Sequence, residues 1–60
     1  MGRMVYGDVQ SAVNRLRNNG VNVDQEGGVV TIPVKMDVGI KLWGAIDYLK
    51  SYHKYVWVRA

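Results

Sequence analysis

Valine and polar residues alternate over residues 21–24 and again over residues 29–34, with Gly27 and Gly28 between the two runs. Side chains alternate between the two faces of a strand, so every second residue shares a face. A two-residue loop, either Gly27-Gly28 or Glu26-Gly27, turns both apolar sets to the same side, and glycine supplies the positive φ of such a turn. The pattern predicts a β-hairpin whose inward residues are Val21, Val23, Val30, Ile32 and Val34.

Apolar residues at helical spacing follow two aspartates, Asp8 and Asp37, each a suitable N-cap. The first stripe ends at Asn18-Asn19-Gly20, and Val5 falls on the same stripe upstream; the second stripe continues to about His53. The predicted stripes are Val9, Ala12, Val13 and Leu16, and then Ile40, Leu42, Ala45, Ile46, Leu49 and Tyr52. We therefore expect two amphipathic helices, one on each side of the hairpin along the chain.

Residues 55–59 are typical of a third strand, with Val56 and Val58 on one face. Pro33 has no N–H to donate to a ladder, so the second strand either lies at an edge or ends near this residue, and we expect the first strand in the centre. The predicted fold is a single two-layer α+β domain over residues 1–60, in the order helix-strand-strand-helix-strand (αββαβ). We expect an antiparallel three-stranded sheet in the order 2-1-3, with both helices on the valine face.

Sixty residues bury a small core, and the chain has no cysteine to strengthen it with disulfides or thiolate metal sites. Self-association is one way for so small a domain to gain stability, so a homodimer is plausible. No apolar stretch is long enough to cross a bilayer and no secretory signal is present, which predicts a cytoplasmic protein. The net charge of +3 and the pI near 9.5 favour acidic partners.

Residues capable of catalysis are few. His53 is the single histidine, and no base is placed beside Ser11, Ser51 or Thr31 by any familiar motif. One histidine and scattered carboxylates do not make a metal site, and Gly27-Gly28 lacks the spacing of a phosphate-binding loop. We predict a non-enzymatic protein without a metal or another cofactor.

One face of the first helix carries hydrogen-bonding side chains and no acid after the N-cap. Its residues are Gln10, Ser11, Asn14, Arg15, Arg17 and Asn18. Asn and Ser are weaker helix formers than the Glu and Lys of an ordinary solvated face. Arg, Asn, Gln and Ser pair with base edges and phosphates, so this face is a candidate nucleic-acid-binding surface. The alternative is an ordinary polar surface.

Residues 10–15, Gln-Ser-Ala-Val-Asn-Arg, resemble the recognition helix of the Cro family of phage repressors, in which a strand pair also follows that helix. The resemblance implies DNA binding through this helix. The element order is similar to that of BON domains, small modules associated with membranes and phospholipids.

The sheet face away from the helices is a second candidate surface. Its predicted residues are Asn22, Asp24, Thr31, Tyr55, Trp57 and Arg59. Exposed Trp and Tyr beside Arg can stack unpaired bases, and the same three residue types dominate protein interfaces. The third strand is an edge open to a second copy. Trp43, Lys50 and Lys54 form a further possible contact patch near Asp47 on the second helix. The alternative function is therefore a protein-interaction module, an inhibitor, adaptor or homodimer.

Overall fold

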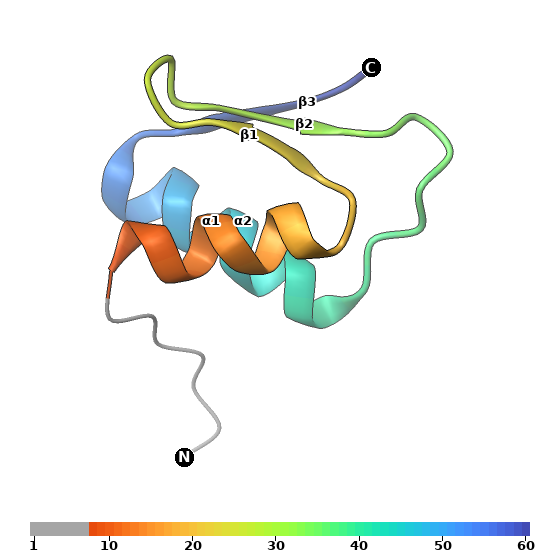
Figure 1. Cartoon of the computed structure of the whole chain (residues 1–60), viewed down its shortest axis with the longest axis horizontal. Coiled ribbons are helices and arrows are strands. Elements are labelled where there is room, and N and C mark those ends of the chain that lie inside the picture. Colours follow the sequence, from red (N-terminus) through yellow and green to blue (C-terminus); the bar gives the residue numbers. More distant parts are fainter. Residues whose placement is uncertain (1–7) are drawn as a thin grey trace.

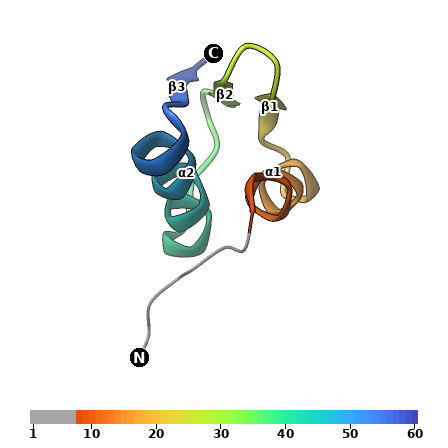
Figure 2. The same cartoon turned by 90° about the vertical axis from the view of Figure 1, so that its left-hand side faces the viewer.

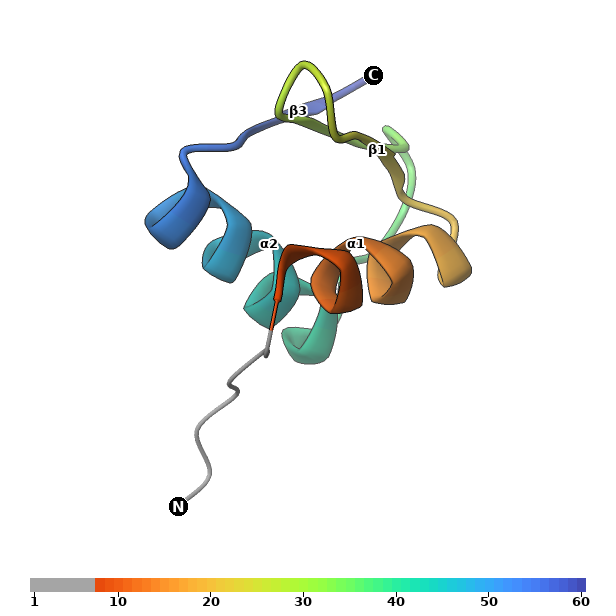
Figure 3. The same ribbon diagram turned by 60° about the vertical axis from the view of Figure 1, so that its left-hand side comes forward.

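The protein is seen in a computed structural model that describes residues 8–60; Val5 lies outside the described residues. Two helices pack on one side of a three-stranded sheet and form a two-layer α+β structure (Figures 1 and 3). The elements are α1 (Val9–Asn18), β1 (Asn22–Asp24), β2 (Val29–Ile32), α2 (Ile40–His53) and β3 (Val56–Arg59). The predicted element order is confirmed.

The two ends of α1 follow the local signals in its sequence. Asp8 is the N-cap, and its carboxylate accepts a 2.9 Å hydrogen bond from the backbone N–H of Ser11. At the other end the chain turns through Gly20 with φ of +88°, a conformation in which a side chain would be strained. Ala12, Val13 and Leu16 face the core as predicted.

The hairpin has the predicted facing but a longer turn. Val23 lies opposite Val30, which places both apolar sets on the helix side of the sheet. The loop contains four residues, 25–28, instead of two. The backbone N–H of Gly28, at φ +69°, donates to the Asp24 carbonyl at 2.8 Å, and the Asp24 carboxylate accepts from the N–H of Gly27 at 3.1 Å. The prediction of a two-residue turn was wrong because Asp24 stabilises a wider loop through both of its acceptors.

The order of the sheet is β1-β2-β3, with β2 in the centre (Figure 2). β1 pairs antiparallel with β2, and β3 pairs parallel with β2, so the predicted order 2-1-3 and the fully antiparallel sheet were wrong. β2 ends at Ile32, and Pro33 follows it outside the ladder, so the missing N–H does not limit the strand to an edge. Val34 also lies beyond the strand and is 61% exposed, contrary to its predicted inward position.

The faces of β3 are the reverse of those predicted. Trp57 lies beside Val30, and adjacent residues of paired strands point to the same side, so the Trp57 side chain is on the helix face. Val56 and Val58 are on the outer face and about half exposed. Tyr55, predicted to be exposed, is buried and belongs to the core. Contact with α2 therefore decides which residues of β3 point toward the helices.

α2 begins at Ile40 with Gly39 as N-cap, two residues after the predicted N-cap Asp37, and it ends at the predicted His53. Ala45, Ile46 and Leu49 are buried as predicted. Ile40 and Tyr52, which were also assigned to the apolar stripe, are 88% and 75% exposed because they lie at the two ends of the helix.

The core lies between the sheet and the helix layer. Its buried residues are Ala12, Val13, Leu16, Val21, Val23, Val30, Ile32, Ala45, Ile46, Leu49 and Tyr55. Among residues 8–60 the buried side chains are all apolar except for Tyr55, which carries a hydroxyl. Candidate sites must therefore be sought on the surface.

Candidate functional site

The outer face of α1 forms a shallow, open hollow of about 530 Å³. Its lining residues are Ser11, Asn14, Arg15, Asn18 and Asn19, which we call the α1 polar face. Four of the five were predicted from the sequence. The hollow contains one positive charge and no carboxylate, so it suits an anionic or strongly hydrogen-bonding ligand.

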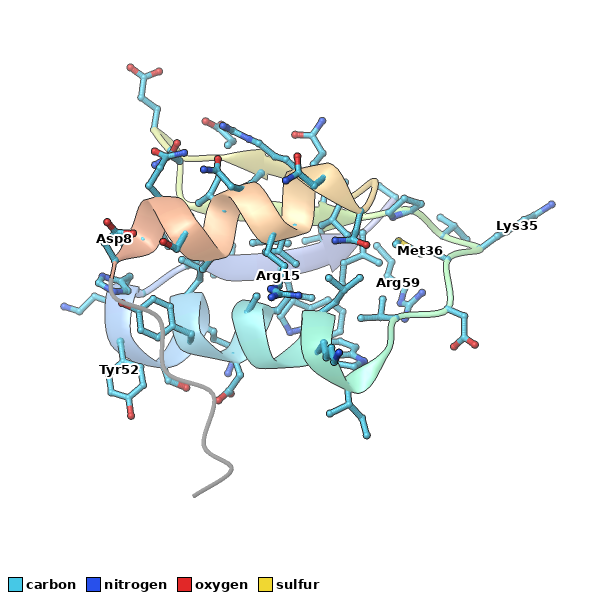
Figure 4. All side chains as sticks on the ribbon, turned by 60° about the horizontal axis from the view of Figure 1, so that its bottom comes forward. Asp8, Arg15, Lys35, Met36, Tyr52 and Arg59 are labelled. Atoms are coloured by element: carbon cyan, nitrogen blue, oxygen red, sulfur yellow. The ribbon has the colours of Figure 1, made fainter. Side chains whose placement is uncertain are left out.

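Arg15 is the charged residue of the α1 polar face. Its guanidinium lies over the seam between α1 and α2, on the side of the helix layer away from the sheet (Figure 4). Within residues 8–60 no hydrogen bond or ion pair engages the Arg15 or Asn18 side chain. Five guanidinium N–H donors are thus available for a phosphate or a base edge.

The remaining predicted residues are engaged within the protein. The Gln10 amide donates to the Asn14 side-chain oxygen at 2.9 Å, which orients both amides on the helix surface. Arg17 Nη2 donates to the Val23 carbonyl at 2.8 Å and joins α1 to β1. Gln10 and Arg17 do not line the hollow, so we assign Arg17 a structural role.

Asn19 is the residue of this face that sequence reasoning missed as a site member. Its side-chain amide donates to the Arg15 carbonyl at 2.7 Å, and its backbone N–H donates to the Leu16 carbonyl at 3.0 Å. The Asn18-Asn19-Gly20 sequence indicated the end of a helix. The Asn19 amide that caps the last turn also adds a polar group to the face. A polar capping residue next to a polar helix face was therefore the signal in the sequence that could have identified Asn19.

The charge at the N-terminal end of the α1 polar face depends on Asp8. Hydrogen bonds from the backbone N–H of Ser11, and secondly from its hydroxyl, lower the pKa of Asp8 below its ordinary value. The carboxylate is therefore ionised at neutral pH, where it caps the positive end of the helix dipole.

We expect the Asp8 cap to give a pH-dependent contribution to stability. Because the folded pKa is the lower one, this stabilisation is full above the unfolded pKa and is lost as the pH falls through the folded pKa. Asp8→Asn keeps a side-chain acceptor without the charge, so the difference in Tm between wild type and variant should shrink on acidification. A Tm difference that stays constant between neutral and strongly acidic pH would contradict this prediction.

The aromatic surface predicted on the outer sheet face does not form, because Trp57 lies on the helix side, where it meets a tryptophan from another predicted patch. Trp57 of β3 and Trp43 of α2 form an edge-to-face pair with ring centroids 5.1 Å apart. Trp57 remains 38% exposed, and Trp43 is half-buried. The sequence placed these tryptophans in two separate patches, and the structure brings them into one, which we call the tryptophan flank.

Other residues predicted for this interface have different roles. Arg59 Nη1 donates to the Met36 carbonyl at 2.9 Å and to the Val34 carbonyl at 3.4 Å, so this side chain anchors the β2–α2 loop (Figure 4). Tyr55 is buried. Lys50 and Lys54 are exposed near the end of α2. Asn22 and Asp24 are exposed and Thr31 is half-buried, on the outer face of the sheet as predicted.

Metal ligation and membrane insertion find no support in the part of the chain that the structure describes. Residues 8–60 contain no group of three or more His, Cys, Asp or Glu side chains that could hold a metal ion. His53 packs edge to face on Tyr48 at 5.0 Å between ring centroids, at the exposed end of α2. Neither described helix has the length and apolar character needed to span a bilayer.

Comparison of the chain with protein-family models, with curated proteins and with solved structures finds no match. The function must therefore be inferred from the α1 polar face and the tryptophan flank themselves.

Proposed function

We propose that the protein is a non-enzymatic DNA-binding protein that contacts its ligand through the α1 polar face. The observation that carries this proposal is the Arg15 guanidinium, which nothing among residues 8–60 engages, in a hollow lined otherwise by serine and asparagine. Arginine beside amides is the combination that contacts phosphates and base edges. The net charge of +3 favours the same class of ligand.

The geometry of the helix layer supports contact with the sugar-phosphate backbone of a DNA strand. α1 has ten residues, about 15 Å of helix at 1.5 Å per residue. Asn14 and Asn18 are four residues apart and share a side of the helix, with Arg15 beside them over the seam with α2. α1 and α2 lie side by side in one layer (Figure 2), so we assign Arg15 to a phosphate and the asparagine amides to neighbouring sugar, phosphate or base atoms.

Removing the central charge tests the proposal. We expect Arg15→Gln to weaken binding of a short duplex or of its single strands about tenfold at low salt. The slope of log affinity against log salt should fall by about 0.9 on the duplex and about 0.7 on the single strands, because one phosphate contact is lost. Fluorescence anisotropy titrations over a range of salt concentrations measure both quantities.

The matched control is Lys35→Gln, which removes the same charge from the loop at the far end of the molecule (Figure 4). Lys35 is exposed and outside the α1 polar face. Its loss should lower affinity by less than about twofold, because Lys35 does not line the hollow and acts only through the net charge. Equal losses of affinity in the two variants would show that binding depends on net charge and not on the α1 polar face. No binding by the wild type at low salt would refute the proposal.

A further inference from the structure

The two edges of the sheet differ in how their backbone groups are occupied. On β1 the Val23 carbonyl accepts a hydrogen bond from Arg17, and the strand has only three residues, with the charged Asp24 at its end. Arg17 and the short length together block the pairing of a further strand with this edge. Among the described residues, nothing gives the free side of β3 an equivalent protection.

The hydrogen bonds between β3 and β2 show which backbone N–H and C=O groups of β3 remain free. Val56 donates its backbone N–H to Gly28 and Ala60 donates to Ile32, so the even-numbered residues face β2. Trp57 and Arg59 consequently present their N–H and C=O groups at the outer side of the strand. Figure 2 shows no described segment beside β3 on that side. The sequence of residues 56–58, Val-Trp-Val, has no charge, proline or glycine of the kind that discourages edge pairing.

We propose that this free edge binds a second copy of the same chain, with β3 paired antiparallel to β3 of the partner around a two-fold axis. The result is a continuous six-stranded sheet with all four helices on one face. This inference goes beyond DNA binding and does not depend on it.

The free groups select one register. The backbone N–H of Tyr55 already donates to the Leu49 carbonyl at 3.1 Å, so pairing is best placed on Trp57 and Arg59. Opposing Arg59 to its own copy would bring two guanidinium-bearing strand ends together, which is unfavourable. When Trp57 lies opposite the partner's Arg59, the two-fold axis also places Arg59 opposite the partner's Trp57. The two pairs then use every free N–H and C=O of these two residues. This register places Val58 directly opposite the partner's Val58.

The side chains and the size of the domain agree with a second copy as the occupant. Val58 is on the outer face and 44% exposed, so its apolar contact with the partner's valine would exclude water without disturbing the core. Below the sheet, α2 lies at the border of the helix layer next to β3 (Figure 2), and its Trp43 contacts Trp57, so the tryptophan flank is on the side where the partner's α2 would lie. A stable interface needs about 800 Å² from each partner, more than a four-residue edge offers, and the tryptophan flank supplies the additional area.

A single cysteine tests the register. The chain has no cysteine, so Val58→Cys introduces the only thiol. In the proposed dimer the two residue-58 Cα atoms are about 4.5 Å apart, within the range that a disulfide spans. We expect nearly complete cross-linking under mild oxidation at low protein concentration. Val56→Cys is the matched control, because a four-residue offset places the two thiol positions about 14 Å apart and prevents a bridge.

Charge at the same position provides an independent readout. Val58→Lys and Val58→Glu should each be monomeric in sedimentation equilibrium, because like charges would oppose each other across the axis, and an equimolar mixture should regain the dimer. Val34→Lys, on a more exposed valine outside the sheet, should remain dimeric. A monomeric wild type at high protein concentration, or equal cross-linking of the two cysteine variants, would overturn the proposal. DNA binding by a monomeric Val58→Lys would leave the proposed function intact.

Discussion

Leu16→Ala is expected to leave most of the protein unfolded at 37 °C. Leu16 is fully buried and lies on the face of α1 that packs between the sheet and α2. Truncation of a buried leucine costs about 3–5 kcal/mol through lost transfer energy and the cavity that remains. A 60-residue domain has a total stability of roughly 3–9 kcal/mol, so this single loss removes most of it. Thermal and urea unfolding followed by circular dichroism measure the effect.

The control for Leu16→Ala is Ile40→Ala on α2. Ile40 is an equally large aliphatic residue but is 88% exposed at the first position of its helix. Its truncation should change the free energy of unfolding by less than about 0.5 kcal/mol. If the two variants unfolded at similar urea concentrations, the assignment of α1 to the core would be wrong.

Trp57→Ala is expected to lower the free energy of unfolding by about 2 kcal/mol. Truncation of a buried tryptophan costs about 3–5 kcal/mol, and Trp57 is partly exposed, so a smaller loss is appropriate. Part of the loss comes from the edge-to-face contact with Trp43, which contributes about 0.5–1.5 kcal/mol beyond burial. On the outer face predicted from the sequence, Trp57 would have no such contact and its truncation would be nearly neutral.

A double-mutant cycle separates this contact from general packing. Trp43→Ala and Trp57→Ala should show a coupling energy of about 0.5–1.5 kcal/mol, measured from the two single variants and the double variant by urea unfolding. Val56→Ala is the control on the outer face of β3, and it should show no coupling to Trp43→Ala. The measurements are made at protein concentrations where each variant is monomeric, so that association does not contribute. Additive effects of the two tryptophan substitutions would contradict the observed facing of β3.

The two proposals combine in a simple way. A two-fold axis perpendicular to the sheet keeps both helix layers on the same side, so the proposed dimer presents two copies of the α1 polar face in the same direction. Two linked weak sites on one DNA molecule gain affinity through effective concentration, without any new contact. A dimer that binds DNA more tightly than the Val58→Lys monomer, with the same dependence on Arg15, is the expected joint result.

The α1 polar face illustrates how much of a site local sequence can predict. Helical periodicity alone identified Ser11, Asn14, Arg15 and Asn18 as neighbours on one surface, because residues three and four apart share a side of a helix. The same periodicity could not show that Arg17 reaches the Val23 carbonyl, because that bond joins two elements whose packing is not local. Because of this nonlocal hydrogen bond, Arg17 does not line the α1 polar face and instead contacts the edge of β1.

The sequence by itself determined the features that depend on neighbouring residues: the element order, the cap of α1 at Asp8, and the shared apolar face of β1 and β2. Only the tertiary structure decided the order of the strands and the facing of β3. In residues 55–58 the odd-numbered side chains are aromatic and the even-numbered ones are valines, so the pattern does not show which set faces the core. The contact of Trp57 with Trp43 selects the phase, and the pairing of β3 with β2 leaves its other edge free.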